Sequence, residues 1–462
     1  MEFSDTEKAL HEPAPGFESD ATVTRAQQKP IGNTSEVNFR SCLTVLGGSL
    51  AVFCSVGFVN AFGVFQEYYK QNMLQDKSES DISWIGSVSI FLIYILSPVA
   101  GIVVDRFGPT TLLASGSLGL LVAVFTTSLC TKYYQFFLAQ AVLLGASMAF
   151  LTLPPISVVS RCLPKHRGLA VGLVVGGSSI GGVVWPIMLE RLLSTTDLGF
   201  GWVMRIVGFT MLPLLAFACA TVREPLSSSP QQLPPAVAQS LEDSSENSRN
   251  SNSTKIAAAV KEPKTKAWDI SIIKNQVFLC LCLGLALAYF GLFIPFFYVS
   301  SYAISRGIDA QLSFYLIAIM NGASLFGRTI PGHFADRWGY FNMILFALAT
   351  SAITGFCWTA ATSLAGLIVW SLAYGFASGA ILTLQSACAG KIATHQTQGT
   401  AMGILMGALS VTSLVGSPIG GSLVSNHGYL ALSMFTGATL IAGTFFVVVS
   451  GLLLNREVFV AV

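Results

Sequence analysis

The sequence predicts an all-α membrane protein in which twelve transmembrane helices form two pseudo-symmetric six-helix bundles. Three observations support this fold class. Hydrophobic residues make up 53% of the 462 residues and charged residues only 10%, whereas soluble domains carry about 25% charged residues. Twelve apolar runs are long enough to cross a hydrocarbon core about 30 Å thick. Eleven identities then relate the two halves of the chain at one offset of 231 residues.

The apolar runs fall into two groups of six. The first group lies at about 42–65, 82–104, 110–130, 133–158, 167–190 and 201–221, and the second at about 276–300, 312–332, 339–360, 363–386, 398–424 and 428–454. The segment between them is rich in Ser, Pro, Gln and Asn, which is typical of a linker without a core. We therefore expect a disordered tail (1–41), an N-terminal bundle (42–221), a linker (222–275), a C-terminal bundle (276–454) and a second tail (455–462).

The distribution of Lys and Arg predicts that both chain ends lie in the cytosol. With the N-terminus inside, 18 of the 25 Lys and Arg residues fall on inner segments and 5 on outer segments. Cytosolic loops of membrane proteins carry an excess of positive charge. We expect a multi-pass protein of the plasma membrane, with a vacuolar or other internal membrane as the alternative.

The repeat is clearest in two charged motifs. G-I-V-V-D-R-F-G at 101–108 matches G-H-F-A-D-R-W-G at 332–339. Repeated halves that enclose a site near the membrane midplane are an architecture of secondary transporters. Because both copies keep the acid–base pair in loops that are otherwise poor in charge, we predict a cytosolic gate; the alternative is a topological turn with solvated charges. The predicted gate residues are Asp105, Arg106, Asp336 and Arg337.

Glycines four residues apart form a second repeated feature. Such spacing places small residues on one helix face, where they allow two helix backbones to approach closely. We predict that these glycines pack the fifth and eleventh spans tightly and let them rock. They are Gly168, Gly172 and Gly176, with Gly399, Gly403 and Gly407 at the same offset.

An arginine inside the eighth apolar run is the leading candidate for a binding residue. Arg328 lies eight residues before Asp336, which is roughly 12 Å along a helix. This depth is near the centre of the bilayer, where an ionisable residue is a functional-site hypothesis by default. Asn321 and Ser324 share its helix face. No apolar run contains an Asp or Glu at mid-depth, which favours an anionic ligand; the alternative is an arginine bonded to backbone carbonyls.

Four further polar residues are predicted to line a central cavity with Arg328 and Asn321. Amides and hydroxyls in hydrocarbon need hydrogen-bond partners, and aromatic bodies suit a mixed cavity. These residues are Asn60, Tyr289, Tyr374 and Gln385. We find no nucleotide-binding motif, no cysteine pair at metal-binding spacing and no catalytic cluster. We therefore expect no enzyme activity, metal, cofactor or nucleic-acid partner.

Six segments resemble the major facilitator superfamily and, within it, the fungal monocarboxylate-transporter-like branch. They are N-A-F-G-V-F-Q-E-Y-Y at 60–69, L-P-K-H-R-G-L-A-V-G at 163–172, F-G-L-F-I-P-F-F-Y-V at 290–299, N-G-A-S-L-F-G-R at 321–328, Y-G-F-A-S-G-A at 374–380 and G-S-P-I-G-G-S-L at 416–423. The resemblance implies the major facilitator fold. The arginine of animal lactate-type members carries over to Arg328, whereas Ser324 stands where those members have Asp. Relatives in the fungal branch look like carriers of larger organic solutes, including vitamins and exported secondary metabolites.

These observations predict a secondary-active or facilitative transporter of a small organic solute. We expect it to work by alternating access, as a monomer in the lipid bilayer, with a monocarboxylate-like or secondary metabolite as cargo. Export is the first reading of direction, and uptake or facilitated diffusion of a vitamin or organic acid is the alternative. A non-transporting membrane sensor, whose tail or linker recruits partners, is a third reading.

Overall fold

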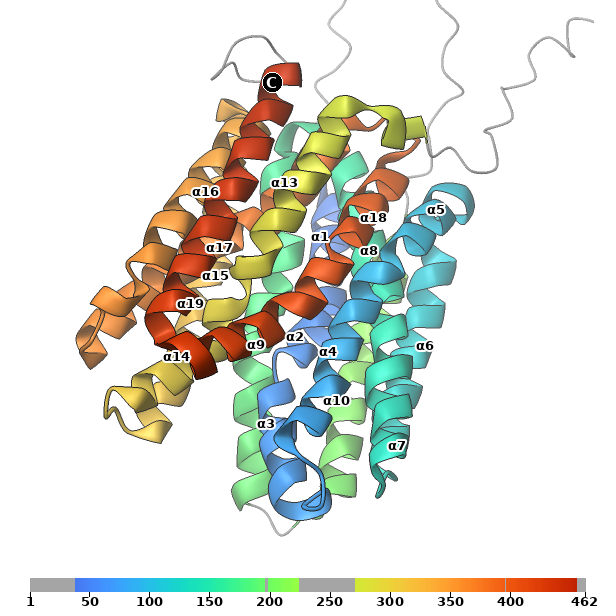
Figure 1. Ribbon diagram of the computed structural model, residues 1–462. Helices are drawn as coiled ribbons and strands as arrows, with labels where there is room; N and C mark the ends of the chain where they lie inside the picture. Colours follow the sequence, from blue (N-terminus) through green and yellow to red (C-terminus); the bar gives the residue numbers. More distant parts are fainter. Residues whose placement is uncertain (1–37, 196–197, 224–270, 395, 455–462) are drawn as a thin grey trace, which may run out of the picture. The chain divides into compact units, whose positions relative to one another are not determined.

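The computed structural model describes residues 38–195, 198–223, 271–394 and 396–454, and every regular element in these ranges is a helix. Figure 1 shows the helices from α1 to α10 in blue to green and those from α13 to α19 in yellow to red. Most of the expected N-terminal tail, most of the expected linker and the expected C-terminal tail lie outside the described residues, and α1 begins within the expected N-terminal tail, at Phe39.

The helices form twelve spans, six before and six after the linker region. The first six are α1 (Phe39–Cys54) with α2 (Val56–Val59), α3 (Phe62–Tyr68) and η1 (Tyr69–Met73); α4 (Glu79–Ile95) with α5 (Ser97–Phe107); α6 (Pro109–Thr127); α7 (Tyr133–Phe136) with η2 (Phe137–Leu143) and α8 (Leu144–Cys162); α9 (Arg167–Thr195); and α10 (Phe200–Thr221). Nine stretches among the described residues are long and apolar enough to cross a membrane.

The second six spans follow the same order of elements. They are α13 (Gln276–Leu292) with α14 (Ile294–Ser305); α15 (Ala310–Trp338); α16 (Tyr340–Phe356); α17 (Leu364–Ile392); α18 (Gln398–Ala408) with the first part of α19 (Ser410–Leu454); and the remainder of α19. Gly428 separates the last two spans, because its φ of 76° interrupts α19. Three short 3-10 turns, Pro164–His166, Ser271–Lys274 and Trp358–Ala360, complete the described structure.

Several spans are broken near their middle. Prolines lie just after the breaks between α4 and α5 and between α13 and α14, at Pro98 and Pro295, where a missing N–H interrupts the helical hydrogen bonds. Two π-helical segments, η1 and η2, occur in the first and fourth spans. They meet where the Tyr69 hydroxyl donates to Gln140 Oε1 at 2.7 Å.

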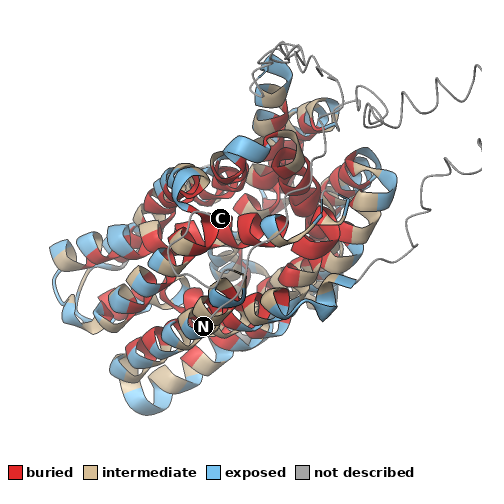
Figure 2. Ribbon diagram, turned by 90° about the horizontal axis from the view of Figure 1, so that it is seen from above, coloured by how far each residue is buried: buried red, intermediate tan, exposed pale blue. Residues whose placement is uncertain are grey.

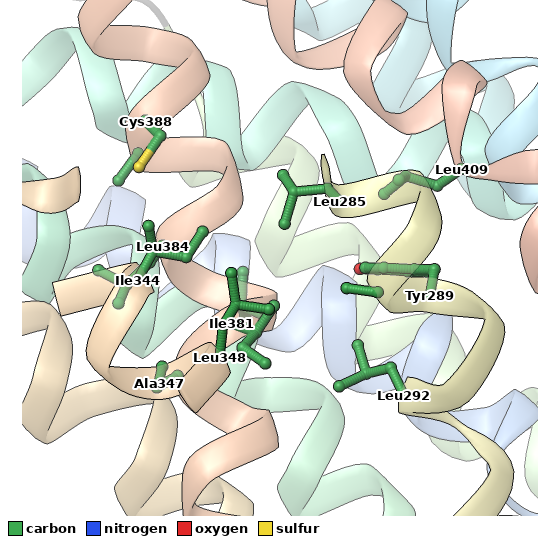
Figure 3. Close-up of a cluster of buried hydrophobic side chains, with 14 of the residues drawn as sticks. Leu285, Tyr289, Leu292, Ile344, Ala347, Leu348, Ile381, Leu384, Cys388 and Leu409 are labelled. Atoms are coloured by element: carbon green, nitrogen blue, oxygen red, sulfur yellow. The ribbon is translucent and has the colours of Figure 1, made fainter. Parts of the chain in front are cut away.

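Each bundle has a core of aliphatic and aromatic side chains. In Figure 2 the buried residues lie on the helix faces turned toward neighbouring helices, and exposed residues lie on the outer faces. Figure 3 shows part of the C-terminal core, where α13, α16 and α17 bring buried side chains together. The polar face predicted for the eighth span is also buried, since Asn321, Ser324 and Arg328 are 5%, 0% and 5% exposed.

The two halves meet along two pairs of helices. α9 of the first half packs against α15 of the second, and α18 of the second half packs against α5 of the first. The 231-residue offset relates these two contacts, because α9 corresponds to the α18 region and α5 to the last part of α15. Two symmetry-related seams therefore run between the halves, and all of the candidate gate residues lie at their ends.

Candidate functional site

Asp336 joins the two halves at one end of the α9–α15 seam. Its carboxylate accepts hydrogen bonds from the backbone N–H groups of Gly168, at 2.7 Å, and Leu169, at 3.1 Å. These are first-turn amides of α9, which have no partner within their own helix. The Tyr340 hydroxyl donates to the same carboxylate at 2.9 Å. A negative charge at a helix N-terminus also interacts favourably with the helix dipole. We call this arrangement the Asp336 cap.

Asp105 makes the equivalent contact on the other seam. It accepts from the N–H groups of Gly399, at 3.0 Å, and Thr400, at 2.6 Å, in the first turn of α18. The Thr400 hydroxyl adds a third bond at 2.7 Å, and Arg161 Nη2 lies 3.4 Å from the carboxylate. We call this arrangement the Asp105 cap. The two caps hold the halves together at the same end of the molecule.

The neighbouring arginines behave differently from the aspartates. Arg106 and Arg337 are exposed, and the Arg106 guanidinium lies over the Phe107 ring. All four residues lie in the last turns of α5 and α15, so the prediction that the charged pairs lie in loops is wrong. The chain leaves the helix only at Gly108 and Gly339, whose φ values of 79° and 90° suit glycine.

The predicted glycines lie in the two seams between the halves. A Cβ at Gly168 would overlap the carbonyl of Gly332, and one at Gly172 would overlap the carbonyl of Arg328. On the other seam, a Cβ at Gly403 would overlap the carbonyl of Ser97. A Cβ at Gly399 would overlap the Asp105 carboxylate, one at Gly407 the Pro98 ring, and one at Gly176 would crowd the Leu325 side chain. Glycine is required at Gly168, Gly172 and Gly403 because two helix backbones approach each other directly there.

Arg328 of α15 bridges the halves on the α9–α15 seam, where it contacts α9 about one turn beyond Gly172. Its Nη1 donates to the backbone carbonyl of Val175 at 2.8 Å and to the hydroxyl of Ser178. Its Nε is buried and has no partner among the described residues. Within the described part of the chain, no carboxylate lies within ion-pair distance of this guanidinium. The charge is thus held by neutral oxygens of the opposite half.

Asn60 and Asn321 come together at Gly182, one helical turn along α9 from Ser178. A Cβ at Gly182 would lie 2.9 Å from Asn60 Nδ2 and 3.0 Å from Asn321 Oδ1. Asn60 Nδ2 also donates to the backbone carbonyl of Ser178 at 3.4 Å. The two amides come from opposite halves and meet on α9 at a glycine, which leaves room for them.

A cavity of about 250 Å³ begins at Asn60 and Gly182. It runs between the first span, α9 and α15, and away from the caps. One helix face of α9 forms a wall with Val183, Pro186, Ile187 and Glu190, while Asn60 lies at its deep end. Gly182 is fourteen residues from Gly168, or roughly 20 Å along the helix. The seam is therefore closed at the cap end and open at the other.

The remaining predicted residues lie away from this cavity. Tyr289 donates to Gln385 Oε1 at 2.8 Å, and Figure 3 shows the Tyr289 hydroxyl directed away from α13 toward the side where α17 lies. Tyr374 donates to the carbonyl of Leu292 at 2.8 Å. All three side chains are at most 3% exposed. They are satisfied by protein partners in this conformation, so their contact with a solute stays a prediction.

Sequence reasoning missed two residues at the centre. Ser178 accepts from Arg328, and its position in the apolar run V-V-G-G-S-S-I gave only a weak signal. Tyr94, from the second span, packs edge-on against Tyr289 with ring centroids 6.0 Å apart. A central tyrosine pair from opposite halves cannot be recognised from either helix alone.

Comparison with known proteins decides the family. The family model described as Major Facilitator Superfamily matches residues 48–364 and 325–459. An MFS-type transporter of Aspergillus fumigatus is 56% identical over 421 residues, which cover 91% of this chain and 94% of that protein. The chain belongs to the major facilitator superfamily. Other fungal relatives of this major facilitator protein include the agnestins efflux protein of Paecilomyces divaricatus, 43% identical over 94% of the chain and 92% of that protein.

A second relative named for efflux and two solved structures extend this picture. The aspyridones efflux protein of Emericella nidulans is 37% identical over 87% of the chain and 76% of that protein. A proton:xylose symporter and the human organic anion transporter MFSD10 each superpose with a TM-score of 0.63, at 12% and 15% identity. They cover 88% of this chain, and 94% and 98% of their own chains. At such identities the likeness concerns the fold.

Membership confirms the predicted twelve-helix fold and the prediction of a membrane transporter. The superfamily consists of transporters rather than enzymes. The narrower monocarboxylate-transporter-like branch stays a prediction. Among the described residues, no group of three or more His, Cys, Asp or Glu side chains is placed to hold a metal ion.

Proposed function

We propose that this major facilitator transporter exports a carboxylated secondary metabolite from the cytosol by alternating access. The observation that carries the proposal is Arg328, a guanidinium buried at mid-span whose protein partners are all neutral oxygens. A buried charge is costly unless it is paired. Carboxylates pair with guanidinium through two parallel, charge-assisted hydrogen bonds. A carboxylated solute would supply the partner that the described residues lack.

The cavity above Arg328 supports an amphipathic cargo. Its walls carry aliphatic side chains such as Val64, Val183 and Ile187, while its deep end carries the amide of Asn60. Asn321 lies beside this amide at Gly182, and the two amides form the floor of the proposed site. An acid with an apolar body would place its body against the walls and its carboxylate near the floor. Tyr289, Tyr374 and Gln385 would join the site once the central region opens.

The caps support a sided mechanism. With both termini in the cytosol, the caps lie at the cytosolic end and the cavity opens outward. Asp105 and Asp336 then stabilise the closed cytosolic gate, and Arg106 and Arg337 lie exposed beside them. Release of both caps would let α9 and α18 move away from their seams and open the cytosolic side. The superfamily relatives named for efflux support export as the direction.

Arg328→Ala tests the proposal in inside-out plasma-membrane vesicles of a fungus that expresses the carrier. We expect flux of the exported acid to fall by about a hundredfold, because a charge-assisted bidentate pair is lost. Arg205→Ala is the matched control, since Arg205 also lies within a span but stacks on Trp202 with 4.8 Å from its guanidinium carbon to the ring. Normal flux in the Arg328 variant, at equal surface abundance, rules out the anion site.

The same assay separates the alternatives. Uptake or facilitated diffusion of a vitamin or organic acid predicts that flux follows the gradient in either vesicle orientation. Energised export predicts accumulation only in inside-out vesicles. A membrane sensor predicts substrate-dependent signalling without flux in either orientation. Fractionation of plasma and vacuolar membranes, with the carrier detected by antibody, decides between the two expected locations.

A further inference from the structure

Ser178 is the point where the closed seam ends and the open cavity begins. Toward the caps, the α9 and α15 backbones touch at Gly172, which faces the carbonyl of Arg328. One turn beyond Ser178, on the side away from the caps, Gly182 borders the cavity. Between them, Ser178 binds residues of both halves. Its hydroxyl accepts from Arg328, and its backbone carbonyl accepts from Asn60 at 3.4 Å.

We propose that Ser178, with the Val175 carbonyl, is an internal substitute for the anionic group of the cargo. This inference rests on the proposed function. In the empty carrier, these two oxygens occupy Arg328 Nη1 and hold α9 against α15 at mid-span. A carboxylate competes for the same guanidinium and binds it more strongly, because both partners are then charged. Cargo binding therefore removes the hydrogen bonds that join Arg328 of α15 to α9 near the cavity.

Three observations make Ser178 suitable for this exchange. Its side chain is 1% exposed, so water does not weaken the bond to Arg328. It also donates to the Val175 carbonyl at 2.9 Å, so it can keep a hydrogen bond after Arg328 leaves. Arg328 Nε has no partner among the described residues, so the guanidinium retains a donor with which to begin binding a carboxylate. The exchange therefore leaves no buried hydroxyl unsatisfied.

The consequence is a link between cargo binding and gating. Arg328 lies eight residues from Asp336 on one helix, and the seam between them includes glycine contacts, the Arg328 bond and the Asp336 cap. When the Arg328 bond is exchanged for a carboxylate, this seam loses one of its two polar contacts, and the cap remains. A cargo-loaded carrier is thereby easier to open at the cap end than an empty one, which is the population shift that a carrier needs.

Phenylglyoxal, which modifies unengaged arginine side chains, provides a direct test. The rate of Arg328 modification is measured by peptide mass spectrometry in purified full-length carrier, with Arg205 as an internal reference. We expect Ser178→Ala to raise this rate by about tenfold, because one hydrogen bond to a charged group is lost. Ser179→Ala is the matched control: its hydroxyl is adjacent, 1% exposed and without a partner among the described residues. Equal rates in the two variants overturn the proposal.

Benzoate then tests the exchange itself, with benzamide as the neutral control. We expect benzoate to protect Arg328 from phenylglyoxal at about tenfold lower concentration in Ser178→Ala than in Ser179→Ala. Benzamide should not protect. Equal protection in both variants, or none in either, overturns the exchange. Loss of flux in Arg328→Ala together with equal phenylglyoxal rates would refute only this inference. Faster modification of Ser178→Ala with normal flux in Arg328→Ala would instead refute the anion site.

Discussion

The two caps use aspartates and pairs of backbone amides that are related by the sequence repeat, but their side-chain partners differ. Asp105 also receives the Thr400 hydroxyl and lies 3.4 Å from Arg161. Asp336 receives the Tyr340 hydroxyl from its own half. The 231-residue offset relates Thr400 to Leu169 and Arg161 to Ile392, so neither partner has an equivalent. The backbone part of the caps is therefore duplicated, while the side-chain part is specific to each seam.

This difference predicts that the two seams open with unequal ease. A carboxylate that accepts three hydrogen bonds beside a guanidinium stabilises its contact more than one that accepts three bonds from neutral groups. The Asp105 cap closes the α5–α18 seam, which lies away from Arg328, and the Asp336 cap closes the α9–α15 seam, which contains it. The weaker cap, at Asp336, thus closes the seam that contains Arg328, the proposed binding residue. Opening would begin there.

Asp105→Asn should have the largest effect on the gate. It removes the charge from three hydrogen bonds and from the Arg161 contact, whose side chains are 9% and 10% exposed. We expect the closed state to be destabilised by about 2–3 kcal/mol relative to the open state. The measurement is maleimide labelling of Ala401→Cys, a fully buried residue beside the cap on α18, followed by peptide mass spectrometry. Labelling should rise by about 30-fold to 150-fold.

An exposed neighbour provides the control for that variant. Arg106→Gln removes a charge of the same motif, but the arginine is exposed and lies over Phe107. We expect labelling of Ala401→Cys to change by less than about threefold. Equal increases in Asp105→Asn and Arg106→Gln would show that net charge, rather than the cap, determines closure.

Asp336→Asn should have a smaller effect on its own seam. The asparagine oxygen can still accept one of the two backbone N–H groups. Among the described residues Asp336 forms no salt bridge, and only the weaker interaction with the Arg167 charge is lost. We expect the closed state to be destabilised by about 1–1.5 kcal/mol. The measurement is labelling of Ala170→Cys, which should rise roughly tenfold. Ala170 is 2% exposed and is related to Ala401 by the repeat offset, so the two reporters are matched. A larger rise here than for Asp105→Asn would reverse the proposed order of the caps.

Much of this architecture is predictable because membranes impose strict lengths on helices. The twelve spans follow from apolar runs, and the offset of 231 identifies both aspartates and all six glycines. These features depend on spacing along one helix. The burial of Asn321, Ser324 and Arg328 follows in the same way from helical periodicity.

The contacts between halves are not predictable from spacing. That Asp105 caps α18 and Asp336 caps α9 depends on which helices pack together, which neither motif encodes. Ser178 illustrates the same limit, because its partner Arg328 lies 150 residues away. The π-helical segments are also not predictable from the sequence. η2 lies inside an apolar run without a change in composition, and η1 follows the first apolar run in the polar segment Y-K-Q-N-M.

Leu169→Thr should have the smallest effect. It tests directly whether the Thr400 hydroxyl explains the difference between the two caps. It gives the Asp336 cap the hydroxyl that Thr400 gives the Asp105 cap, at the equivalent position of α9. One added hydrogen bond to a carboxylate should stabilise the closed seam by about 0.5–1 kcal/mol. Labelling of Ala170→Cys should then fall by about threefold. Leu169→Val is the matched control, because valine has the shape of threonine without the hydroxyl. If both variants label alike, the hydroxyl of Thr400 does not explain the difference between the caps, and Arg161 remains as its source.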